Sequence, residues 1–305
     1  MTTAIILAVA EIFGLFMIGA AARRMGYISD EEITRWSRLV MDFLLPPFMF
    51  TSIVNGLEAG RLHELWKLPA VGLGMVIFFT LCGVPLLFGL RSRDRELRRT
   101  FLHICAVNNS TFLPTVILRN MWGEGALASL FLMYLGGVVG VWTIGVGLLG
   151  GATFRERLKK MVSPVLIAIF VAIPAAMAGG KAIIPPLIMN ILNRAGGISI
   201  PLMLVITGAS LAHRGILNLS WQNLYVIVVR LLVLPLLTIP LLYLLPLPGD
   251  IRAITVIVAL MPSAVSSVVM TRRFGGSTDY AATTAFITTV LSMITAPLGV
   301  WLLFK

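Results

Sequence analysis

The chain has 305 residues, of which 58% are hydrophobic and only 12% are charged. Soluble domains carry about 25% charged residues, so this sequence lacks the material for a polar shell and is predicted to be an integral membrane protein. Its net charge of +11 does not indicate nucleic-acid binding, because the basic residues lie in short loops between apolar runs, where membrane proteins use them to set orientation.

Apolar stretches recur from one end of the chain to the other. A helix needs about 20 apolar residues to cross a bilayer core. Four stretches are long and free of charge, and six more are interrupted by a polar or ionisable group or by proline. The sequence therefore predicts ten transmembrane helices: Ala4–Ala22, Leu39–Gly56, Leu68–Leu90, Phe101–Leu118, Ala126–Phe154, Met161–Gly180, Gly196–Ala212, Trp221–Pro248, Ala253–Thr271 and Tyr280–Phe304.

The loops predict the orientation of these helices. Lys and Arg gather in alternate loops, most densely in Arg91–Arg99 and Arg155–Lys160. Because cytoplasmic loops carry the excess of basic residues, we expect a multi-pass protein of the inner (plasma) membrane with both termini outside.

An internal repeat is the next prediction. When Gly123 is aligned with Gly275, Trp122 falls on Phe274, and a long apolar helix follows each pair. Five helices per half place the second half in the opposite orientation, as in many transporters. The expected fold is therefore all-α, with two inverted five-helix repeats (1–150 and 163–305) joined by a cytoplasmic loop (151–162).

Polar residues and prolines interrupt the fourth and ninth predicted helices. At 1.5 Å per residue, both interruptions lie about ten residues from the basic residues at either end of the helix, so both lie near mid-membrane. Broken backbone is tolerated there only inside the protein or along a wet cavity. One interpretation is a pair of broken helices crossing at a substrate site, and the other is ordinary kinks with polar residues that join helices. The candidate binding residues are Asn108, Asn109, Ser110, Thr111, Pro114, Pro262, Ser263, Ser266 and Ser267.

Three ionisable residues lie within predicted helices: Glu11, Asp42 and Arg230. Intramembrane charges are costly and usually face a cavity or a partner. Asp42 and Arg230 are candidates for an ion pair, and Asp42 and Glu11 are candidates for carrying a proton. Glu11 as a hydrogen-bonded structural carboxyl and Arg230 reaching toward the headgroups are the alternatives. We therefore regard all three as coupling or gating candidates.

Several short motifs resemble the auxin efflux carrier family of permeases. They are Arg24-Met25-Gly26-Tyr27-Ile28, Leu44-Leu45-Pro46-Pro47-Phe48, Thr207-Gly208-Ala209-Ser210-Leu211, Val229-Arg230-Leu231 with Pro235, and Met261-Pro262-Ser263. The resemblance implies ten helices with both termini outside, crossed broken helices and an elevator-like transport domain. It also implies organic-anion substrates, such as auxin or dicarboxylates, and the short loop between the halves resembles compact bacterial members. Asn108-Asn109 fits the family's asparagine in the first crossover, whereas the second crossover has Met261 and serines instead.

The predicted function is a secondary transporter of small organic anions. The chain has no Arg or Lys within the two interruptions themselves, so helix dipoles and amide donors are expected to hold the carboxylate. A sodium-coupled symporter resembling the bile acid transporters is the alternative, with sodium held at the crossover by oxygen ligands. A proton is the other candidate for coupling.

Other classes of protein are disfavoured by the sequence. The three histidines are scattered and no paired aspartates or zinc motif occur, so neither an enzyme nor a resident metal or cofactor is expected. Small residues such as Gly136-Gly137 and Gly179-Gly180 allow close helix approach. They favour internal packing and leave a homodimer open.

Overall fold

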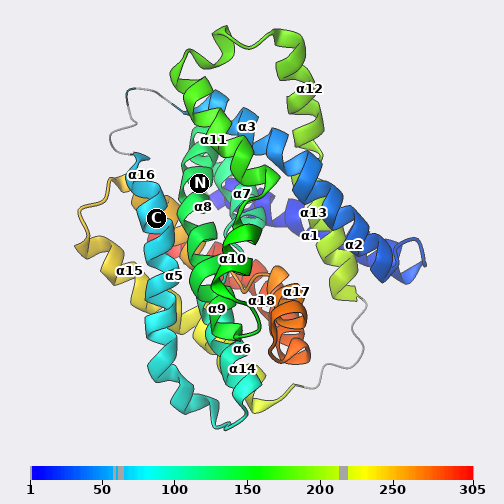
Figure 1. The fold of residues 1–305 in the computed structure, drawn as a ribbon, viewed down its shortest axis with the longest axis vertical. Coiled ribbons are helices and arrows are strands. Elements are labelled where there is room, and N and C mark those ends of the chain that lie inside the picture. The colour runs from blue at the N-terminus through cyan, green and yellow to red at the C-terminus, as the bar shows by residue number, and fades with distance from the viewer. Residues whose placement is uncertain (1, 58–59, 61–64, 213–218, 305) are drawn as a thin grey trace. The chain divides into compact units, whose positions relative to one another are not determined.

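The computed structural model describes residues 2–57, 60, 65–212 and 219–304. Over these ranges the regular structure is entirely helical (Figure 1). The chain divides into two compact units, each built from three separate stretches. The first unit comprises Met1–Lys67, Thr111–Leu132 and Val162–Gly215, and the second comprises Leu68–Ser110, Met133–Met161 and Ile216–Lys305.

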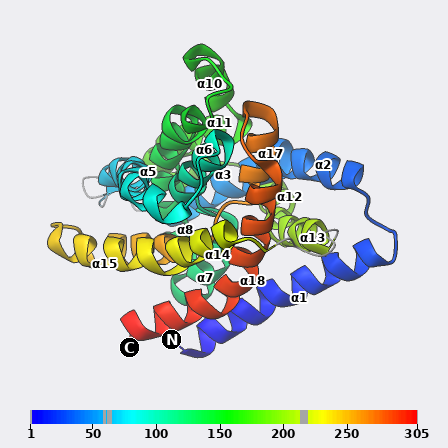
Figure 2. The same cartoon turned by 90° about the horizontal axis from the view of Figure 1, so that it is seen from below.

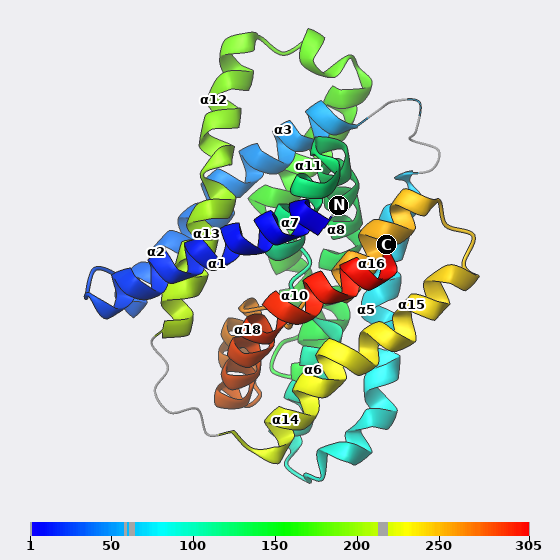
Figure 3. The ribbon, with the colours of Figure 1, turned by 180° about the vertical axis from the view of Figure 1, so that it is seen from behind.

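The first unit is a helical bundle in which α1 packs along α13 (Figure 3). Gly19 and Gly208 make this close approach possible, because a Cβ at Gly19 would lie 1.9 Å from Val205 O and one at Gly208 would lie 2.2 Å from Phe16 O. The helices of this unit are α1 (Thr2–Arg24), α2 (Asp30–Leu39), a π-helical turn (Val40–Leu44), α3 (Leu45–Gly56), α7 (Phe112–Trp122), the start of α8 (Glu124–Gly140), α11 (Pro164–Met177), a 3₁₀ turn (Gly180–Ala182), α12 (Pro186–Gly197) and α13 (Ser199–Ala212).

The second unit contains both helices that end in broken backbone. Its elements are α5 (Lys67–Leu86), a 3₁₀ turn (Leu87–Leu90), α6 (Arg95–Ala106), the end of α8, a π-helical turn (Val141–Gly145), α9 (Val146–Leu149), α10 (Phe154–Met161), α14 (Trp221–Val228), a π-helical turn (Val229–Val233), α15 (Leu234–Leu244), α16 (Gly249–Ala259), α17 (Ser266–Phe274) and α18 (Thr278–Leu303). The α14–α15 stretch forms one long helix, and α17 turns back into the long helix α18 (Figure 2).

Six described helices are long and apolar enough to cross a membrane, and a seventh appears if α10 and α11 form one span bent by 53°. This agrees with an integral membrane protein. The count is lower than the ten spans expected, in part because the fourth and ninth predicted helices are each divided into two pieces of 9 to 12 residues, which are individually shorter than the roughly 20 residues needed.

The helices of the second unit depend on glycine where α5 meets α8. A Cβ at Gly136 would lie 1.7 Å from Pro69 O, and a Cβ at Gly72 would lie 2.0 Å from Met133 O. The neighbouring Gly137 has open space around its Cβ position. Close contact between backbones is how helices associate in lipid, where no hydrophobic effect drives them together.

This contrast predicts that Gly136→Ala destabilises the protein and that Gly137→Ala does not. The methyl group at residue 136 has to displace backbone, and overpacking of that kind costs about 1–3 kcal/mol. Thermal unfolding in nanodiscs checks this, with Gly137→Ala as the matched control. Equal stability of the two variants would show that α5 and α8 are not held at this distance.

Candidate functional site

Both polar interruptions are true breaks rather than kinks. Helix α6 ends at Ala106 and α7 begins at Phe112, while α16 ends at Ala259 and α17 begins at Ser266. Pro114 lies in the first turn of α7, where a proline costs little because the missing N–H would have no partner within the helix. Pro262 lies within the second break itself. The interpretation of Pro114 and Pro262 as ordinary mid-helix kinks is therefore wrong.

The two breaks of the second unit are joined by their main chains. Asn108 and Ser263 form an antiparallel bridge. The amide of Asn109 donates to Pro262 O at 2.9 Å, and that of Ala264 donates to Val107 O at 3.3 Å. Unpaired backbone groups are costly inside a membrane, so this short pairing compensates for part of the helical bonding that the breaks remove.

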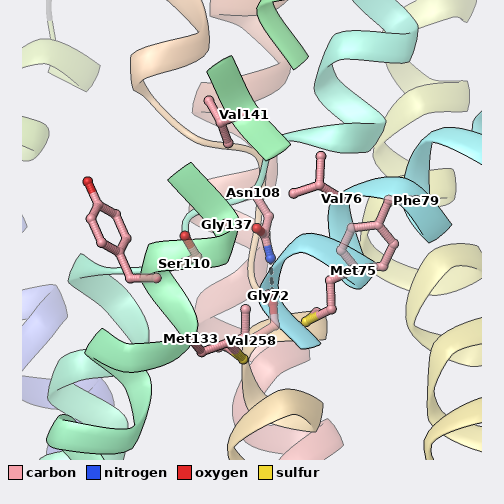
Figure 4. A pocket seen from close by; sticks show the side chains of 11 residues that line it. Gly72, Met75, Val76, Phe79, Asn108, Ser110, Met133, Gly137, Val141 and Val258 are labelled. Carbon is pink, nitrogen blue, oxygen red and sulfur yellow. Dashed lines mark hydrogen bonds between the residues drawn. The ribbon is translucent and has the colours of Figure 1, made fainter. Parts of the chain in front are cut away.

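The Asn108 side chain bonds to the end of the opposite broken helix. Its Nδ2 donates to Val258 O at 2.7 Å (Figure 4). Val258 lies in the last turn of α16, and its carbonyl lacks the usual α-helical donor four residues on because that residue is Pro262. The carbonyl accepts instead from Met261 N at 3.2 Å and from Asn108. A freed carbonyl near Val258 is what the position of Pro262 predicts, and Asn108 is its side-chain donor across a separation of 150 residues.

Arg230 brings a positive charge to this site from outside the two interruptions. It lies on the π-helical turn between α14 and α15 and is fully buried. Its Nε and Nη2 donate to Met261 O at 3.1 and 3.0 Å, Nη2 also donates to Ala259 O at 3.4 Å, and Nη1 donates to Cys105 O at 3.2 Å. The two interruptions themselves contain no Arg or Lys, as the sequence shows, and the structure brings Arg230 against their backbone from another helix.

The partners of Arg230 also exclude the alternative of a side chain reaching for lipid headgroups. Its guanidinium lies 4.6 Å from the centre of the Phe79 ring, and its four hydrogen bonds end on backbone carbonyls of the second unit. The helix ends that supply those carbonyls carry partial negative charge. They stabilise the guanidinium within the second unit, whereas Asp42, its candidate ion-pair partner, belongs to the first unit.

Ser263 connects the second break to α18. Its Oγ lies 2.8 Å from Thr288 Oγ1, which is itself within 2.7 Å of Thr284 O. Because a hydroxyl has a single hydrogen, Thr288 donates to the carbonyl and accepts from Ser263. Ser267 is also buried, and among the described residues its Oγ has no hydrogen-bond partner, whereas Ser266 is exposed.

The Ser263–Thr288 bond is expected to contribute modestly to stability. Interhelical hydrogen bonds in membrane proteins average about 0.6 kcal/mol and reach about 1.7. A double-mutant cycle of Ser263→Ala and Thr288→Val, followed by thermal unfolding, measures the coupling. Additive single effects would mean that the two hydroxyls do not interact.

A small cavity lies beside Asn108 in the second unit (Figure 4). Its lining includes the polar residues Asn108, Ser110 and Tyr134, and its apolar walls include Phe79 and Val141. The cavity volume is about 20 Å³, which is enough for a water molecule and too small for an organic acid. The cavity therefore provides a water-sized space beside Asn108 and is not a complete substrate site.

The remaining predicted residues belong to the first unit. Thr111 is buried just before α7, and its carbonyl accepts from Thr115. Asp42 lies exposed on the π-helical turn between α2 and α3. Glu11 is exposed on α1, and its carboxylate accepts from Asn120 Nδ2 at 3.4 Å. The structure does not assign a coupling role to Asp42 or Glu11.

His103 is a buried residue that the sequence did not single out. It lies one turn before the first break and is fully buried, with Nδ1 2.8 Å from Gly145 O. Gly145 closes a π-helical turn, an element that often occurs at functional sites. Only its position five residues before Asn108 marked it in the sequence.

The chain is helical and apolar, and two of its helices are interrupted where their backbones are buried and hydrogen-bonded to each other. This arrangement is typical of membrane transport proteins. A comparison with known families agrees with this, because the family model described as membrane transport protein matches residues 4–157 and 152–300. The chain belongs to this family, which is the auxin efflux carrier family that its motifs resemble.

Two curated relatives cover almost the whole chain. An uncharacterized transporter of Methanocaldococcus jannaschii is 25% identical in an alignment of 302 positions that covers 95% of this chain and 96% of the relative. An uncharacterized transporter of Methanothermobacter thermautotrophicus is 26% identical in an alignment of 305 positions that covers 95% of each chain. Neither name specifies a substrate.

Proposed function

We propose that this protein is a secondary transporter that carries small organic anions, either dicarboxylates or auxin-like carboxylates. The observation that supports this best is the joining of two broken helices through Asn108 and Ser263. Broken helices expose partial charges to a substrate without bringing in many formal charges. That arrangement suits a carrier, which has to release its substrate as readily as it binds it.

The second unit offers several groups for a carboxylate. Asn109 and Ser110 lie half-buried in the first break, and Ser266 begins α17. The start of a helix carries partial positive charge, and the buried Arg230 adds a full positive charge close to the same backbone. We propose that these groups compensate the negative charge of the substrate while Asn108 and Ser263 hold the breaks together.

We also propose the finer architecture that the family resemblance implies. The chain would contain ten helices in two inverted repeats, 1–150 and 163–305, with both termini outside. Each compact unit combines segments from both of these halves. A transporter of the elevator type needs two such units, because one must carry the substrate while the other stays fixed in the membrane.

Uptake of labelled malate, malonate and indole-3-acetate into proteoliposomes tests the proposal. Wild type, Asn109→Ala and Asn193→Ala would be compared, because Asn193 is an exposed asparagine on α12 and serves as the control. We expect uptake in wild type and Asn193→Ala and a loss of uptake in Asn109→Ala. No uptake by intact protein would reject the substrate class, and equal uptake by all three would reject the site.

The same assay separates the modes of coupling. Each protein would be run with an inward proton gradient, an inward sodium gradient and no gradient. Stimulation by sodium would favour the symporter alternative. Stimulation by protons would favour Glu11 or Asp42 as the proton carrier.

A further inference from the structure

The carbonyl groups at the crossover already have a cationic partner. Unwound carbonyls and the carboxyl ends of half-helices are the groups that coordinate sodium in many transporters with broken helices. Here Cys105 O comes from the end of α6, and Ala259 O and Met261 O come from the end of α16. All three accept hydrogen bonds from one side chain, Arg230.

We infer that Arg230 is a resident cation that takes the place of a free coupling cation, so that this protein transports its substrate without sodium. The inference rests on the proposed transport function and adds to it the absence of a sodium requirement. It concerns the hydrogen bonds of Arg230 to the carboxyl ends of the broken helices, in addition to the positive charge that Arg230 is proposed to supply near the substrate.

The geometry supports a permanent rather than an exchangeable cation. The guanidinium is always protonated and has five N–H donors in a fixed plane, and four hydrogen bonds extend from it to the two helix ends at 3.0–3.4 Å. The Phe79 ring lies 4.6 Å from it, an arrangement that stabilises a desolvated cation. The side chain is fully buried and covalently held, so it cannot leave during a transport cycle.

The same charge disfavours a second cation at these carbonyls. Like charges within about 4–6 Å destabilise one another, and any ion bound to Met261 O or Cys105 O would lie next to the guanidinium. Asn108 already donates to the adjacent Val258 O. A sodium ion would have to displace Arg230 to gain these oxygen ligands.

Replacing Arg230 with alanine should remove the resident cation and leave the three carbonyl groups without a cationic partner. We expect wild-type uptake to be equal in sodium, potassium and choline media. Arg230→Ala should lose uptake in choline by about tenfold or more, as expected when a charged hydrogen-bond partner is removed. Guanidinium or sodium at millimolar concentration should restore part of that loss, because either cation can occupy the vacated carbonyls.

Arg252→Ala is the matched control. Arg252 lies in the same unit, donates to Leu247 O at 3.0 Å and lies 5.0 Å from the Tyr243 ring, yet it is outside the crossover. Its variant should show neither the loss nor the rescue. Rescue of both variants by guanidinium would point to a general effect of the ion and would overturn the inference.

A second measurement does not depend on transport. The thermal unfolding temperature of purified Arg230→Ala should rise with millimolar guanidinium or sodium relative to choline, and that of wild type should not. Arg230→Lys retains the positive charge, so it should stay independent of sodium even if Arg230→Ala fails to fold.

The possible failures are distinguishable. If wild type moves no anion under any gradient, the proposed function is wrong, while the unfolding experiment still tests the cation site. If wild type or Arg230→Lys transports but requires sodium, or if Arg230→Ala works normally in choline, the inference is wrong and the transporter assignment stands.

Discussion

Replacing Arg230 with methionine is expected to lower stability by about 3 kcal/mol or more, because it removes the donor of three buried carbonyl groups, and each unsatisfied buried acceptor costs about 1–3 kcal/mol. Methionine fills much of the space but leaves Cys105 O, Ala259 O and Met261 O without their donor. Thermal unfolding in nanodiscs measures the loss. Uptake should fall in parallel, because the ends of both broken helices lose the group that connects them.

Arg230→Lys is expected to be intermediate. Its ammonium is a compact charge with three donors and lacks the planar fork that spans carbonyls from two helices. Arg252→Met provides the control for loss of an arginine in the same unit and should be much less destabilising, because Arg252 donates to one backbone carbonyl, Leu247 O, in the part of the chain that the structure describes. If Arg230→Met is as stable as Arg252→Met, Arg230 is not the connection between the two helix ends.

Asn108→Ala is expected to reduce uptake by about tenfold or more while the protein still folds. Removal of the amide leaves Val258 O with the Met261 N–H as its donor, at 3.2 Å, and removes the shorter bond of 2.7 Å from Asn108, so we expect a cost of about 1 kcal/mol, that of one ordinary hydrogen bond. Because this bond joins the two breaks, its loss should loosen the geometry of the site. Initial uptake rates over a range of substrate concentrations measure the effect.

Asn193→Ala is the control for that variant. Asn193 is an exposed asparagine on α12 and lies outside both breaks. Asn108→Asp should be worse than alanine, since a carboxylate oxygen would face the Val258 carbonyl. Normal uptake by Asn108→Asp would contradict the assigned role of the amide as a donor.

The membrane character and the broken helices could be predicted from the sequence. Hydropathy depends only on local composition, so long apolar runs such as Leu68–Leu90 predict helices with little help from the rest of the fold. The cost of polar residues and proline in lipid is likewise local, which is why Asn108-Asn109 and Pro262 marked the two breaks. The consistent spacing of both interruptions from their flanking basic residues predicted that they belong together.

The partners of the polar groups could not be predicted in this way. The bond from Asn108 to Val258 O spans 150 residues, and the bond from Arg230 to Cys105 O spans 125. A periodic pattern indicates which residues share a helix face, but it contains no information on which distant helix end will lie against that face. The sequence therefore predicted that Arg230 lies in a helix, but it did not predict the carbonyl groups to which Arg230 donates.

What the sequence determined by itself is a polytopic helical protein whose fourth and ninth apolar segments are interrupted by polar residues and proline near mid-membrane. What only the tertiary structure decided is how the exposed backbone is satisfied, by a bridge between Asn108 and Ser263 and by the guanidinium of Arg230. The physical reason is that the need for a donor arises locally wherever a helix ends in a membrane, whereas the donor is supplied by whichever side chain the fold brings within about 3 Å.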